Sequence, residues 1–165
     1  MEVTLKKGKP SIEDLLIGRW ITSRRGFELR RDFKKYELND KEISREEYED
    51  IEKELLDYLY EKCEQVRILN IGPGEPYSKT VWLYKCPIGK VGMFIDSGDE
   101  YTVFRVYVGD DAWKKAKRDG IEAAEYVNRW FEDFKWEQAH RGDQGIKEIE
   151  EDLKFVLEEM KSLPE

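Results

Sequence analysis

The sequence has few of the residues on which common catalytic centres depend. It contains one histidine, His140, and two cysteines, Cys63 and Cys86. A Ser-His-Asp site would have to use His140, and no nucleophile elbow of the form GxSxG occurs. The histidine and the cysteines do not have the spacing of zinc ligands. Because no CxxC pair is present, we expect no disulfide framework and predict that both cysteines are small, buried apolar side chains.

Long hydrophobic runs are also missing from the chain. No stretch approaches the roughly 18 to 20 apolar residues that a membrane-spanning helix requires. Residues 1–14 lack the apolar core of a secretory signal peptide. We therefore expect a cytoplasmic protein without a membrane partner.

Charged side chains, by contrast, are abundant. They make up 40% of the 165 residues, whereas about 25% is usual. Such an excess is typical of the surface ion-pair networks of thermophile proteins, and simple solubility explains it equally well. The length fits one domain with one packed core. Because the sequence has no internal repeat or linker, we expect residues 1–165 to form a single α+β domain.

The charges are divided unequally along the chain. Residues 1–36 carry ten basic and five acidic side chains, a balance of +5. Since the whole chain sums to −8, residues 37–165 must hold −13. A basic segment attached to an acidic body can orient a partner. The first 36 residues are therefore the expected place of contact with phosphate or with an acidic protein.

Local patterns predict the elements of the first half. Residues 11–18 have the pattern of a short helix capped by Ser11. Residues 19–36 favour strands, although a helical spacing is present too. Asn39-Asp40 can form the turn of a hairpin over residues 36–43. Ser44 then begins a capped helix with a continuous apolar face.

The second half reads as a meander followed by two helices. Residues 66–71 form a short apolar run that ends at a loop rich in glycine and proline. Short connections then imply antiparallel pairing between the expected strands 79–86, 90–96 and 101–108. The next helix begins at Asp110 or Asp111, and Gly120 should bend or interrupt it. The last helix has a/d spacing at Ile146, Ile149, Leu153, Val156, Met160 and Leu163. The predicted fold is α+β, an antiparallel sheet of four to six strands with a capped helix before it and a C-terminal helical pair packed on it.

The run Arg67-Ile-Leu-Asn-Ile-Gly-Pro-Gly74 resembles the first motif of Rossmann-type methyltransferases. In that motif a strand leads into a glycine loop that receives the methionine moiety of S-adenosylmethionine. The resemblance implies a helix directly after the loop, whereas Tyr77-Ser78-Lys79 leads straight into a strand. The likeness covers eight residues, and we expect no cofactor of this kind.

Carboxylates lie near the ends of the last two expected strands. They are Asp96, Asp99, Glu100, Asp110 and Asp111. Carboxylates in such positions hold Mg²⁺ in nucleases and phosphatases, but Asp is also common in turns for backbone reasons. A metal-dependent phosphoesterase or nuclease-like enzyme with Mg²⁺ is therefore the alternative function, while the favoured function needs no cofactor.

The meander also predicts a face rich in aromatic side chains. Alternation can place Val81, Leu83, Met93, Ile95, Phe104, Val106 and Val108 on one side. The opposite side would then hold Trp82, Tyr84, Phe94, Tyr101, Arg105 and Tyr107. Nucleobases stack on such faces, unless helices cover both sides of the sheet, which we favour.

The basic segment mixes cations with aromatic side chains. Its candidate binding residues are Arg24, Arg25, Arg30, Arg31, Phe33, Lys34 and Lys35. We favour a non-enzymatic interaction module that contacts an acidic protein surface or a nucleic acid backbone through them. A solvated strand with internal ion pairs is the simpler alternative. The a/d seam of the last helix could also mediate formation of a homo-oligomer.

Overall fold

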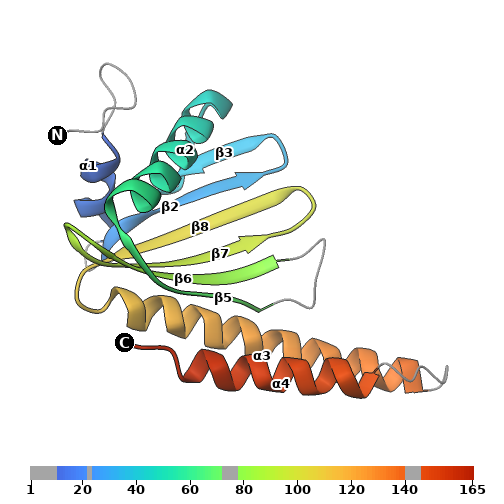
Figure 1. The fold of residues 1–165 in the computed structure, drawn as a ribbon. Coiled ribbons are helices and arrows are strands. Elements are labelled where there is room, and N and C mark those ends of the chain that lie inside the picture. Colours follow the sequence, from blue (N-terminus) through green and yellow to red (C-terminus); the bar gives the residue numbers. More distant parts are fainter. Residues whose placement is uncertain (1–10, 22–23, 72–77, 140–145) are drawn as a thin grey trace.

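The computed structural model of the chain describes residues 11–21, 24–71, 78–139 and 146–165. The elements, in chain order, are α1 (Ile12–Ile17), β1 (Arg19–Ile21), β2 (Arg24–Asp32), β3 (Lys35–Leu38), β4 (Lys41–Ile43), α2 (Arg45–Lys62), β5 (Glu64–Asn70), β6 (Ser78–Cys86), β7 (Gly89–Ser97), β8 (Tyr101–Val108), α3 (Ala112–Ala139) and α4 (Ile146–Lys161). The predicted class, α+β with an antiparallel sheet and C-terminal helices, is confirmed. Figure 1 shows the arrangement.

The described strands form one antiparallel sheet with the order β4-β3-β2-β8-β7-β6-β5, and β1 pairs with β2. The meander predicted over residues 79–108 is present as β6, β7 and β8, and β5 joins it by pairing with β6. The sheet has eight strands, not four to six, because β2 pairs with β8 and brings the N-terminal strands into the same sheet. Residues 19–36, whose spacing fits both a strand and a helix, thus contribute strands that extend the sheet.

Local signals explain where several elements begin and turn. Ser11 and Asp14 form the predicted capping box at the start of α1. Ser44 accepts a hydrogen bond from the Glu47 N–H at the start of α2. Asn39 and Asp40 have φ of 52° and 67°, the left-handed values that a two-residue hairpin turn needs.

Helices cover both faces of the sheet. On the α2 face, α1 and α2 pack over a core that includes Phe27, Leu29, Met93 and Val106. On the α3 face, α3 and α4 pack over a second core that includes Val81, Leu83, Phe94 and Tyr107. The two layers are visible above and below the sheet in Figure 1. Alternation along each strand feeds both cores, as expected for a sheet layered on both sides.

Gly120 does not interrupt α3, contrary to the sequence prediction. The helix runs continuously for 28 residues. A Cβ at Gly120 would lie 2.6 Å from Met160 Sδ and 2.6 Å from Val81 Cγ2. The glycine is therefore a point of close approach between α3, α4 and β6, which a side chain would push apart.

The apolar seam of α4 is directed into the molecule. Leu153, Met160 and Leu163 are buried in the core of the α3 face, and Val156 packs against that core. The structure thus uses the described part of this seam for intramolecular packing. A homo-oligomer through the same residues would require α4 to leave its place.

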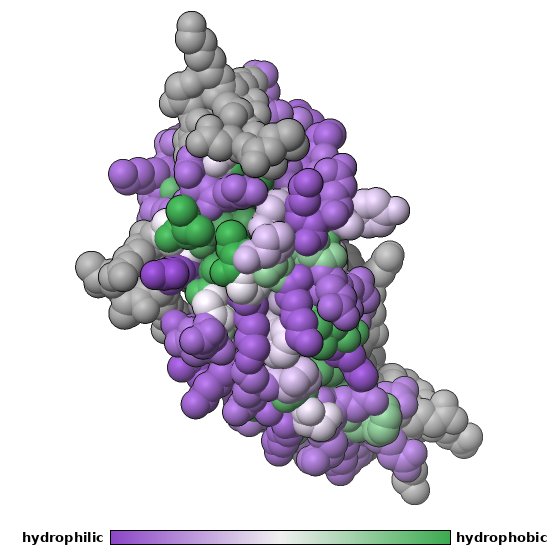
Figure 2. Space-filling model, turned by 60° about the vertical axis from the view of Figure 1, so that its left-hand side comes forward, coloured by the Kyte–Doolittle hydropathy of each residue, from purple (hydrophilic) through white to green (hydrophobic). Residues whose placement is uncertain are grey.

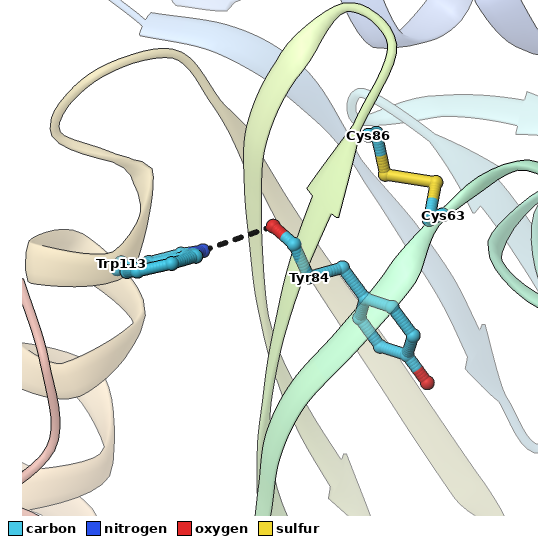
Figure 3. Close-up of a disulfide and its surroundings, with 4 residues drawn as sticks. All are labelled: Cys63, Tyr84, Cys86 and Trp113. Carbon is cyan, nitrogen blue, oxygen red and sulfur yellow. Dashed lines mark hydrogen bonds between the residues drawn. A yellow bond between two sulfur atoms is a disulfide. The ribbon is translucent and has the colours of Figure 1, made fainter.

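Cys63 and Cys86 form a disulfide, which corrects the expectation of two free, buried cysteines. The bond joins the C-cap of α2 to the end of β6 (Figure 3). Both cysteines are half-buried. On the other side of the same strand, the Trp113 indole N–H donates to the Tyr84 carbonyl oxygen at 3.0 Å. The end of β6 is therefore fastened to a helix on each face.

No helix in the described part of the chain combines the length and apolar character needed to cross a membrane. Hydrophilic side chains cover most of the face drawn in Figure 2, and hydrophobic side chains reach that surface in small groups. This fits the high charged fraction of the sequence.

Candidate functional site

The basic side chains of the N-terminal segment are distributed by β2 over two faces. Successive residues of a strand point to opposite sides, so Arg30 lies on the α3 face and Arg31 on the α2 face. Arg25 is exposed, and the side chain of Arg24 lies outside the described atoms. The structure therefore does not gather these cations on one flank.

Arg30 has a carboxylate partner within its own strand. Its Nη2 lies 3.3 Å from Glu28 Oε1, and Arg105 Nε lies 3.5 Å from Glu28 Oε2. Glu28 is 7% exposed. A buried carboxylate is stable only when paired, and the two arginines supply that pairing for Glu28.

The same group of charges continues to α3. Arg105 Nη1 lies 3.9 Å from Asp119 Oδ2, and the Tyr107 hydroxyl donates a hydrogen bond to Asp119. Burial raises the pKa of Asp119, although Tyr107 and Arg105 both act to lower the pKa. This group ties β2, β8 and α3 together, and its charges are matched internally.

Arg31 and Lys35 also have partners. Arg31 Nη2 donates to Thr102 Oγ1 at 3.3 Å, and Lys35 Nζ lies 3.6 Å from Glu37 Oε1. The Lys35 side chain is nevertheless 62% exposed, so this pair is of the weak surface kind.

The turn between β2 and β3 presents the clearest exposed feature of the segment. We call Phe33, Lys34 and Lys35 the hairpin tip. Phe33 is 69% exposed and has φ of 55°. Its backbone N–H donates to the Glu100 carbonyl oxygen at 2.8 Å, which fastens the turn to the β7–β8 connection. The hairpin tip is thus a turn, fixed by a backbone hydrogen bond, that carries an exposed aromatic ring beside two lysines.

The six residues of the predicted aromatic face do not share one face. Trp82 pairs with Met93, and Val81 pairs with Phe94. Trp82 and Tyr84 therefore lie on the α2 face, whereas the α3 face holds Phe94, Tyr101, Arg105 and Tyr107. An offset of one residue along β6 reverses the side of all its residues. Tyr84, Phe94 and Tyr107 are also buried, so no single stacking face exists.

The predicted metal-binding carboxylates are separated by the length of β8. Asp96, Asp99 and Glu100 lie at the β7–β8 connection, and Asp110 and Asp111 follow the other end of β8. A strand of this length spans roughly 26 Å. Asp96 pairs with Lys79 at 2.8 Å. Among the described residues, no cluster of three or more histidine, cysteine or acidic side chains is placed to bind a metal.

Two further sequence features bear on cofactors and catalysis. Gly72-Pro73-Gly74 and His140 lie outside the described residues. β5, which precedes the glycines, pairs antiparallel with β6, and β6 begins at Ser78. The next described element after β5 is therefore an antiparallel strand, whereas the resemblance to methyltransferases implies a helix.

Sequence reasoning missed a groove on the α2 face. Its volume is about 410 Å³, and it lies between the end of α2, β5 and β6. Leu56, Tyr60 and Cys63 form the α2 wall. Their i, i+4, i+7 spacing is a second stripe beside the one that packs on the sheet, and this signal could have revealed the wall.

Comparison with protein-family models, with curated proteins and with solved structures found no match to this chain. Its function must therefore be inferred from its own residues.

Proposed function

We propose that this chain is a non-enzymatic interaction module that contacts an acidic protein surface through the hairpin tip. The observation that carries the proposal is Phe33, a large apolar side chain that is 69% exposed at a left-handed backbone position. This conformation costs a residue other than glycine roughly 1 to 2 kcal/mol. Glycine or asparagine would suit the turn better, so the phenylalanine is explained by contact with a partner.

The neighbours of Phe33 favour a protein partner over a nucleic acid backbone. An exposed aromatic anchor with flanking cations is typical of a contact that fills an apolar pocket with an acidic rim. A phosphate backbone needs several cations on one side, whereas Arg30 and Arg31 point to opposite faces.

The proposal can be tested by photo-crosslinking in the native lysate. We would replace Phe33 with the photoreactive benzoylphenylalanine, which keeps the aromatic ring, and place the same group at Tyr126 as a control. Tyr126 is 59% exposed on α3, far along the chain from the tip. We expect protein adducts from position 33 that are absent from position 126.

Two variants sharpen the test. Phe33→Gly should abolish competition with these adducts while the fold becomes no less stable, because glycine adopts positive φ freely. Lys34→Ala with Lys35→Ala should weaken competition and reduce its dependence on salt. The proposal is wrong if both positions give the same adducts, or if the adducts are nuclease-sensitive nucleic acid.

A further inference from the structure

The groove on the α2 face lies beside an open edge of the sheet. β5 is the last strand in the sheet order, and no strand of the described part of the chain pairs with its outer side. Val66 and Ile68 on this strand are 36% and 37% exposed. An unpaired edge presents backbone donors and acceptors to a further strand.

The side chains around the groove continue the apolar surface of this edge. Ile68 pairs with Trp82 across the two strands, so both lie on the α2 face, and Trp82 lines the groove. Tyr60, on the opposite wall, is 90% exposed. A strand added to β5 would place every second side chain on this face, between Ile68 and the wall formed by α2.

Polar groups at the groove suit a peptide. Trp82 lines the groove, and its buried indole N–H has no hydrogen-bond partner among the described residues. Gln65 adds an amide to the lining. Burial raises the pKa of Tyr84, which keeps that phenol protonated as a donor.

The negative charge of α2 favours a basic partner. The helix carries eight acidic and three basic side chains, a net −5. Asp57 of the groove wall pairs with Lys53 at 2.8 Å, and the helix as a whole keeps its negative charge. A strand paired with β5 presents every second side chain to this helix, so the peptide gains from lysine or arginine two residues before and after its groove-facing apolar residue.

The edge is protected against indiscriminate pairing. The register of β5 shifts between Gln65 and Arg67, and bulges of this kind limit strand addition. Arg67 lies on the α3 face, where its Nη2 is 3.1 Å from Glu159 Oε2 on α4. Arg67 therefore does not extend over the α2 face, where no described strand pairs with the outer side of β5.

We propose that the groove and the β5 edge together bind an extended, basic peptide segment of a partner protein. Backbone pairing with β5 fixes the segment, one apolar side chain enters the groove between Tyr60 and Trp82, and basic side chains face α2. This surface is separate from the hairpin tip.

The test uses two synthetic peptides as long as β5, each with a central valine and with threonine at the alternate positions. The positions two residues before and after the valine, which share its face, are lysine in one peptide and glutamate in the other. Binding is followed by fluorescence anisotropy, and pairing by hydrogen exchange of the β5 amides. We expect the lysine peptide to bind at least about tenfold more tightly and to protect β5. Ile68→Lys and Tyr60→Ala should each weaken binding by about tenfold.

Matched variants separate this proposal from the preceding one. Phe33→Gly and Tyr126→Ala should leave binding of the lysine peptide unchanged. Equal binding of the two peptides, or binding without protection of β5, would overturn the proposal. Light scattering that shows a dimer broken by Ile68→Lys would overturn it too, because the occupant would then be a second copy of the chain.

Discussion

The two faces of the sheet are closed in different ways. On the α3 face, small residues let the helix approach the strands, and a Cβ at Gly92 would lie 2.5 Å from the Ala112 carbonyl oxygen and 3.0 Å from the Ala116 Cβ. On the α2 face, large side chains such as Tyr48, Tyr58 and Leu55 hold the helix above the sheet. The first arrangement brings the backbone of α3 against the sheet, and the second leaves the groove beside β5.

This difference in packing predicts different effects of substitutions on the two faces of the sheet. Close approach of backbone and small side chains gives dense packing that tolerates no added volume. A helix that is held away from the sheet by large side chains, as α2 is, can leave exposed surface along its edge. We therefore expect substitutions on the α3 face to affect stability, and those on the rim of the α2 face to affect binding.

The largest effect is expected at Gly92. Valine at this position would meet backbone atoms of α3, which cannot move aside without displacing the helix. We expect Gly92→Val to lower the free energy of unfolding by roughly 3 kcal/mol, measured by urea denaturation. Lys85→Val, at an exposed position on the neighbouring strand, is the control and should change stability by less than about 0.5 kcal/mol. Equal effects of the two would refute the close packing of this face.

The disulfide offers the next largest effect and separates the faces directly. Cys63 and Cys86 are 23 residues apart, and a crosslink closing such a loop contributes roughly 3 kcal/mol. After replacement of both cysteines with serine, hydrogen exchange should accelerate in α2 and the end of β6 more than in α3. Dithiothreitol should reproduce this in the native chain and leave the double variant unaffected. Equal acceleration in α3 would mean that the disulfide does not act on the α2 face alone.

The disulfide also bears on the location predicted from the sequence. Disulfides are rare in cytoplasmic proteins apart from intracellular proteins of hyperthermophiles. A charged fraction of 40% is typical of the same class of organisms. The cytoplasmic location stays a prediction, and fractionation of the native cells would test it.

A pH-dependent effect is expected from Asp119 on the α3 face. Burial raises the pKa of Asp119 from its ordinary value of 3.8, so the folded chain binds this proton more tightly than the unfolded chain does. The stability from this proton is present below pH 3.8 and is lost as the pH rises through the folded pKa. The stability of Asp119→Asn relative to the native chain should therefore increase with pH.

Urea denaturation of both proteins across this range measures the difference. Tyr107→Phe removes a hydrogen bond that lowers the pKa of Asp119, so the range over which stability is lost should extend to higher pH. A stability difference between Asp119→Asn and the native chain that falls with rising pH would contradict the direction of the shift.

The sequence predicted the elements whose signals are local. Ser11, Ser44 and the Asn39-Asp40 turn act through neighbouring residues, and the meander follows from short connections. Gly120 was misread because glycine in a helix can mark either a bend or close packing. Only the positions of β6 and α4 decide between these, and both are distant in sequence.

Candidate sites were predicted less well because they depend on register and pairing. The register of β6 in the structure differs by one residue from the predicted alignment, so Trp82 and Tyr84 lie on the other face of the sheet. No local pattern in the sequence specifies this register. The Cys63–Cys86 bond forms because α2 ends beside β6, which spacing alone does not reveal. Phe33 was among the predicted binding residues, but its left-handed backbone conformation follows from the β2–β3 turn, which the sequence did not predict.

The smallest predicted effect concerns the hairpin that extends the sheet beyond β2. Asp40 is exposed with φ of 67°, so Asp40→Gly should relieve strain and raise the free energy of unfolding by roughly 0.5 to 1 kcal/mol. Asn39→Gly is the matched variant, because Asn39 Oδ1 accepts the Glu28 N–H at 2.9 Å. Removing that acceptor should cancel the gain and leave Asn39→Gly less stable than Asp40→Gly. If the two variants gained equally, Asn39 would stabilise the turn through its backbone alone, and the hydrogen bond to β2 would contribute nothing.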